Sequence, residues 1–127
     1  MPNAMKTLRV AAISAAVSSA LTFAFVIACA APAEPETKVV LENERVRVTE
    51  RVIAPQGERT PYIRATDQVI VFLNDTKYER IDAETGDAVV RERRGGEVIW
   101  HDAGENAPKL VNVDSAPFRS LVIELLK

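Results

Sequence analysis

The chain has 127 residues, which is the length of a single domain. Its only cysteine excludes an internal disulfide and a cysteine-cluster zinc site, and its only histidine argues against a histidine-rich metal site. A formal net charge of −2 and an aromatic content of 6% argue against a nucleic-acid partner.

The first 28 residues have the pattern of a signal peptide. Lys6 and Arg9 precede a stretch from Val10 to Ala28 that holds no charged residue, and every acidic residue lies at Glu34 or later. A positively charged start followed by an apolar stretch is typical of an export signal. Because the stretch is long enough to cross a bilayer, an uncleaved membrane anchor is an alternative.

The segment ends in Val26-Ile27-Ala28-Cys29, which resembles the bacterial lipobox, whose cysteine becomes lipidated. Residues 29–37 are rich in Pro, Ala and Glu, and we expect them to form an extended tether. The resemblance implies that Cys29 anchors the chain to a membrane of the bacterial cell envelope, facing the periplasm or the exterior. Ordinary cleavage, which gives a soluble periplasmic or secreted protein, stays open.

Residues 38–127 are predicted to form an all-β domain. Valines alternate with polar residues over 45–54, which predicts a strand with one dry face and one wet face. A run of β-branched residues predicts a central strand over 68–74, buried on both faces. Further strands are predicted over 77–82, 88–93, 97–101, 110–113 and 118–126. Short strands separated by turns are typical of a sandwich or a barrel. The basic residues of 91–94 are predicted to lie on the wet face of a hairpin end.

Residues 39–127 resemble a small single-domain cupin, a double-stranded jelly-roll barrel. Gly57 begins the first motif of that family, and Gly96 and Gly104 stand at glycine positions of the second. The segments 42–48, 55–61 and 112–117 also resemble the sequences of small cupins. The resemblance implies an all-β, cupin-like jelly-roll barrel behind the N-terminal signal segment.

The resemblance breaks at the metal ligands. Cupin metal sites use three histidines and one glutamate, and the matching positions here are Ile63, Ala65, Val69 and Ala107. None of these side chains can donate a lone pair to a metal. The sequence therefore predicts a domain without a metal, a cofactor or a catalytic residue.

The emptied positions are predicted to line a small apolar cavity, with packed core as the alternative. Tyr62 and Trp100 are added to the predicted lining as aromatic residues at the barrel mouth. Arg64 lies between two of the former ligand positions, so it is predicted to point away from the cavity. His101 is predicted to lie at the rim or to face solvent.

These observations predict an exported, lipid-anchored domain with a non-catalytic binding role. Its partner is expected to be a small apolar ligand or a protein, and the resemblance also implies a homodimer. One alternative is a metal-dependent enzyme of the dioxygenase or isomerase type that uses a non-standard site. A purely structural adaptor lipoprotein is the other.

Overall fold

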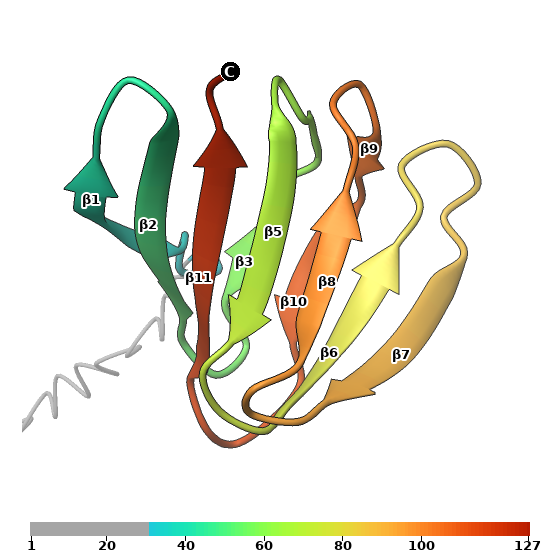
Figure 1. Cartoon of the computed structure of the whole chain (residues 1–127). Helices are drawn as coiled ribbons and strands as arrows, with labels where there is room; N and C mark the ends of the chain where they lie inside the picture. The colour runs from blue at the N-terminus through green and yellow to red at the C-terminus, as the bar shows by residue number, and fades with distance from the viewer. Residues whose placement is uncertain (1–30) are drawn as a thin grey trace, which may run out of the picture.

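A computed structural model describes residues 31–127, which form eleven β-strands and no helix (Figure 1). The predicted signal segment and Cys29 lie outside the described residues. None of the described residues belongs to a helix long and apolar enough to cross a membrane. The predicted all-β fold class is confirmed.

Two antiparallel sheets face each other as the walls of a barrel (Figure 1). The larger sheet has the order β1 (Glu36–Glu42), β2 (Val46–Ile53), β11 (Phe118–Leu125), β5 (Asp67–Phe72) and β8 (Val98–His101). The smaller sheet has the order β3 (Glu58–Arg59), β10 (Lys109–Asn112), β6 (Thr76–Ile81) and β7 (Ala88–Arg93). A short pair, β4 (Tyr62–Ile63) with β9 (Asn106–Ala107), completes the fold.

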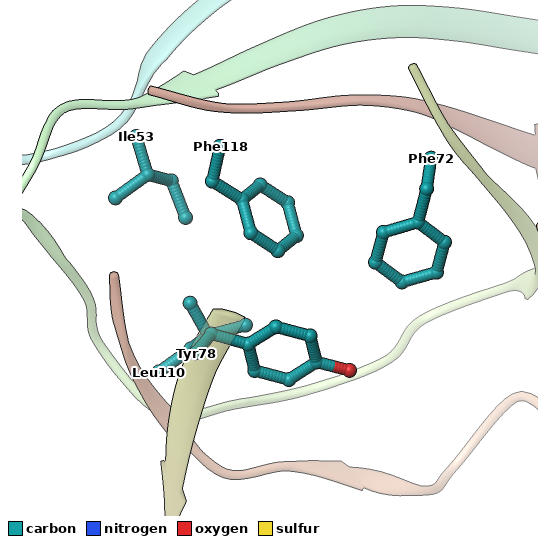
Figure 2. Packing of buried hydrophobic residues seen from close by; sticks show 5 residues of the cluster. All are labelled: Ile53, Phe72, Tyr78, Leu110 and Phe118. Carbon is teal, nitrogen blue, oxygen red and sulfur yellow. The ribbon is translucent and has the colours of Figure 1, made fainter. Parts of the chain in front are cut away.

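The core lies between the sheets and is largely aromatic (Figure 2). Ile53, Phe72 and Phe118 come from the larger sheet, and Tyr78 and Leu110 face them from the smaller one. The Phe118 ring packs edge-on against Phe72 at 5.7 Å and against Tyr78 at 5.4 Å between ring centroids. Edge-to-face contacts of this kind add to the free energy gained from burial alone.

The strand register decides which side chains enter the barrel. Phe118 lies opposite Ile53, and Ser120 lies opposite both Arg51 and Phe72. Because successive residues of a strand point to opposite faces, Arg51 faces inward on β2, and the valines of that strand face outward. The alternation predicted for this strand is confirmed. The valine face was expected to be the dry one, and this is wrong because the face with Arg51 turns to the barrel interior.

Asn112 joins the ends of three strands at one end of the barrel. It is fully buried, and its Nδ2 donates to the carbonyl oxygens of Ile53 at 3.0 Å and Ala116 at 2.9 Å. Its backbone N–H donates to the Gly57 carbonyl at 3.0 Å. A Cβ at Gly57 would come within 2.8 Å of the Ala54 carbonyl oxygen, so this tight turn requires glycine.

Most predicted strands are confirmed within one or two residues, and two details are wrong. β1 begins at Glu36, so the last two residues of the predicted tether belong to a strand at the sheet edge. β5 lies inside the sheet as predicted, but only its inner face, with Gln68 and Phe72, is buried. Its outer face is half-exposed because no element of the described chain covers that side of the larger sheet.

Candidate functional site

A cavity of about 70 Å³ opens between the two sheets, above the aromatic core. A cavity needs about 10–15 Å³ to hold one water, so this cavity has room for several waters or a small ligand group. Its apolar floor is formed by Ile53, Ile70, Phe72, Ile99, Pro108, Leu110 and Phe118. Tyr62, Tyr78 and Ser120 also contribute to the lining.

The polar wall of the cavity is basic. It consists of His101 and five arginines, Arg51, Arg59, Arg64, Arg80 and Arg93. Four of the arginines lie on four different strands and the fifth directly follows β4, so the barrel topology gathers positive charge that is scattered along the chain. No acidic residue of the described part of the chain lines the cavity.

Two of these arginines flank one tyrosine ring. The guanidinium carbon of Arg59 lies 5.3 Å from the centroid of the Tyr62 ring, and that of Arg64 lies 6.0 Å from it. Arg59 Nη2 donates to the Pro108 carbonyl at 2.6 Å, and Arg64 Nη1 donates to the Asn106 carbonyl at 3.1 Å. Burial lowers the pKa of Arg59 to about 10, so the group stays charged at neutral pH.

Arg93 covers the aromatic floor from the side. Its guanidinium carbon lies 5.6 Å from the centroid of the Phe72 ring, and its Nε donates to the Tyr78 hydroxyl at 3.5 Å. Glu97 approaches its Nη1 to 3.9 Å from outside the cavity. Arg93 belongs to the segment 91–94, which was predicted to lie on the wet face of a hairpin end. That prediction is wrong for Arg93, because β7 turns its side chain toward the cavity.

His101 lies at the rim, with its side chain 24% exposed and its Nδ1 3.1 Å from Glu105 Oε2. Burial and the nearby Arg64 lower the pKa of His101, and the hydrogen bond to Glu105 opposes this. The ring is therefore mostly neutral at pH 7. A guanidinium exchanges no proton near that pH, so His101 is the only lining group that can do so.

Three of the predicted cavity residues lie outside the cavity. Ile63 is 68% exposed, Ala65 is exposed, and Val69 is on the outer face of β5. Four residues separate Gly57 from Tyr62, one fewer than the family motif has before its first ligand. A shift of one residue turns every side chain of a strand to the other face.

The inward positions are those directly before the predicted ones. Tyr62 and Arg64 line the cavity, and Gln68 is buried on the inner face of β5. Arg64 was predicted to point away, and that prediction is wrong because the same shift brings it inside. Its backbone N–H donates to the Glu105 carbonyl at 3.0 Å and its carbonyl accepts from Gly104 at 2.8 Å, which fixes that direction.

The remaining two predicted residues also stay out of the lining. Trp100 is 51% exposed on the outer face of β8, where its Nε1 donates to Asp102 Oδ1 at 2.8 Å. Ala107 is buried opposite Tyr62 in the β4–β9 pair, next to the cavity without lining it. The predicted apolar lining is therefore wrong, since the true one combines an apolar floor with a basic wall.

The lining does not fit the divalent metal that a cupin fold implies. Five guanidinium groups repel a cation, and one imidazole gives a single neutral donor. Within residues 31–127, no cluster of three His, Cys, Asp or Glu side chains could hold a metal ion. The donor set suits an anionic group instead, because guanidinium N–H groups bind oxyanions.

Comparisons with known proteins find relatives by structure alone. No protein-family model matches the chain, and no curated protein matches its sequence. A cupin domain from Bordetella pertussis Tohama I superimposes with a TM-score of 0.68 at 23% identity, covering 76% of this chain and 97% of its own. An uncharacterized protein with a double-stranded β-helix domain from Klebsiella pneumoniae gives 0.58 at 17%, covering 76% and 80%.

The structural neighbours include an enzyme of similar shape. The polyketide cyclase RemF from Streptomyces resistomycificus superimposes with a TM-score of 0.59 at 17% identity, covering 77% of this chain and 71% of its own. At such identities the likeness concerns the fold and not the activity. The all-β barrel and these neighbours together identify residues 36–125 as a cupin fold, a double-stranded β-helix.

Proposed function

We propose that this chain is an exported, lipid-anchored binding protein of the bacterial envelope, which holds a small molecule in its barrel without transforming it. The observation that carries the proposal is the cavity, whose apolar floor and basic wall suit a ligand with an apolar part and a polar part. A purely apolar ligand is disfavoured, because it would leave buried guanidinium groups unsolvated.

An enzymatic role is the second candidate and has less support. A metal-dependent reaction needs a donor set that the lining lacks. Arginines are too weakly acidic for general acid or base catalysis, which leaves His101 as a single proton-exchanging group at the rim. A role as a structural adaptor would not require an unfilled, charged cavity. A binding role therefore accounts for the apolar floor and the basic wall of the cavity better than either alternative does.

Lipid anchoring at Cys29 is the second part of the proposal, and it is supported by the lipobox-like residues before it. Stable anchoring requires more than one acyl chain, which a lipidated N-terminal cysteine supplies. Replacement Cys29→Ser is expected to move the protein from the membrane fraction to the soluble fraction of the envelope. Retention of the Cys29→Ser variant in membranes would support an uncleaved anchor instead.

A homodimer is also proposed, on the basis of one apolar face. The outer side of the larger sheet carries an unbroken apolar row across all five strands, formed by Leu41, Val48, Ile123, Val69 and Trp100. A second row adds Leu121, Val71 and Val98, the last of which is 60% exposed. Such a face can pack against its own copy across a twofold axis, because both halves present the same apolar rows.

Native mass spectrometry of the full chain, purified gently from membranes, tests the binding role. We expect a small-molecule adduct that is released when the protein unfolds. Ser120→Leu fills the cavity and should remove the adduct, and Ser115→Leu, in an exposed turn, should keep it. An adduct that survives in the folded Ser120→Leu variant, or no adduct in any form, would contradict binding in the cavity.

A further inference from the structure

The positive charge of the cavity exceeds the negative charge that reaches it. Among residues 31–127, two carboxylates approach from outside, Glu105 at 3.8 Å from Arg64 Nη1 and Glu97 at 3.9 Å from Arg93 Nη1. No carboxylate among residues 31–127 forms an ion pair with the other three lining arginines, Arg51, Arg59 and Arg80. The folded cavity thus holds uncompensated cations at partly buried positions, which an anion would neutralise.

Two of the arginines also keep a buried donor without an acceptor. The Nε groups of Arg59 and Arg64 are shielded from solvent and make no hydrogen bond with any residue that the structure describes. Arg64 is the less solvent-exposed of the two, with only 6% of its side chain exposed. Buried polar groups are normally hydrogen-bonded, so unsatisfied donors at two neighbouring arginines indicate that an acceptor is missing from the site.

The hydrogen bonds that these arginines do make fix their orientation. In each, one Nη group is held by a backbone carbonyl, of Pro108 for Arg59 and of Asn106 for Arg64. Both guanidinium groups lie close to the ring of Tyr62, with their central carbons 5.3 Å and 6.0 Å from its centroid. The Nε groups have no partner among the described residues, and the N–H groups of a guanidinium match the two oxygens of a carboxylate.

From this geometry we infer that the cavity selects a small organic carboxylate with a compact apolar body. The carboxylate lies against Arg59 and Arg64, and the apolar body packs on the floor near Phe72 and Phe118. The inference rests on the proposed binding function and names its ligand class. Inorganic phosphate shares the negative charge but lacks the apolar body, so it uses only half of the site.

Calorimetric titration of the full chain in detergent, with acids and their uncharged amides, tests this ligand class. Isovalerate and benzoate are expected to bind saturably, and isovaleramide and benzamide at least about tenfold more weakly, since a charge-assisted hydrogen bond is lost. Equal binding of acids and amides overturns the ligand class and leaves the binding function standing. Phosphate binding as tight as isovalerate binding overturns the role of the apolar floor. If none of these probes binds, the carboxylate class is wrong, and the adduct experiment above decides the binding function separately.

Variants connect the affinity to the two arginines. Arg64→Gln and Arg59→Gln are each expected to weaken isovalerate binding at least about tenfold, and Arg64→Lys to weaken it as well, because lysine keeps the charge but lacks the fork of donors. Arg119→Gln is the matched control, since Arg119 is exposed and pairs with Glu50 at 2.7 Å. Its affinity should equal that of the wild type. Unchanged affinity in a folded Arg64→Gln or Arg59→Gln variant overturns the inference.

Discussion

His101 is the side chain of the cavity wall whose charge changes closest to neutral pH. Its pKa is lowered in the folded protein by burial and by Arg64. In the unfolded chain its pKa is about 6.5. As the pH falls below that value, the unfolded state takes up a proton that the folded state does not, so stability is lost.

The pH dependence of unfolding tests this effect of His101. Urea titrations between about pH 7.5 and pH 5 should show that the wild type loses more stability on acidification than His101→Gln. Because the chain has no other histidine, the difference between the two curves isolates this group. Parallel curves would mean that His101 titrates at its ordinary pKa.

Asn112 is the residue whose loss should destabilise the barrel end most. Its side chain donates twice from Nδ2 and accepts from the Asp114 N–H at 3.0 Å. Replacement Asn112→Ala should lower the free energy of unfolding by about 2–4 kcal/mol, because the hydrogen bonds go and their buried partners stay unsatisfied. Chemical denaturation measures this. Asn106→Ala, at an exposed position, should change it by less than about 0.5 kcal/mol, and an equal loss in both variants would refute the role of Asn112.

The sequence predicted where strands lie better than which way their side chains point. In β2 the valines and arginines alternate, and apolar residues are normally assigned to the core. Here the inner face of β2 carries Arg51 beside the buried Ile53, so that rule assigns the valines to the wrong face. Arg51, Arg80 and Arg93 were missed for this reason, and the available signal was that arginine recurs in so many of the predicted strands.

At the scale of elements, most of the longer strands were predictable, whereas β1 and the two-residue strands were not. β7 was predicted over the residues that it occupies, 88–93, and β6, β10 and β11 within one residue at each end. β3, β4 and β9 are too short to show any alternation. They carry or adjoin Arg59, Tyr62 and Arg64, so the part of the site that they position could not be deduced from periodicity.

The contact between the two sheets depends on the aromatic cluster. Phe118 packs against both of the other rings in that cluster, Phe72 and Tyr78. Phe118→Ala should lower the free energy of unfolding by about 3–5 kcal/mol, because it removes a buried ring and leaves a void. Thermal and urea unfolding measure the loss. Leu73→Ala removes an exposed side chain just after β5 and should cost far less. Similar losses for both would show that the cluster does not hold the sheets together.

At the scale of the whole molecule, the apolar outer face of the larger sheet should determine the oligomeric state. Native mass spectrometry from detergent is expected to give twice the mass of one processed, lipid-carrying chain for the wild type. Trp100→Glu places a charge in the apolar row and should give the mass of one chain, because burying an unpaired carboxylate is costly. Ile63→Glu, at an exposed site on β4, should leave the dimer intact. A wild-type monomer, or a dimer that survives Trp100→Glu, would contradict an interface on this face.

The most direct test of the ligand site observes the two unsatisfied donors themselves. In the NMR spectrum of arginine side chains, the Nε–H signals of Arg59 and Arg64 can be identified by their disappearance in Arg59→Lys and Arg64→Lys. Added isovalerate should shift both signals saturably, and isovaleramide should not, because only the carboxylate supplies the missing charged acceptor. If isovalerate leaves both signals unmoved at saturating concentrations, the cavity does not bind carboxylates through these arginines.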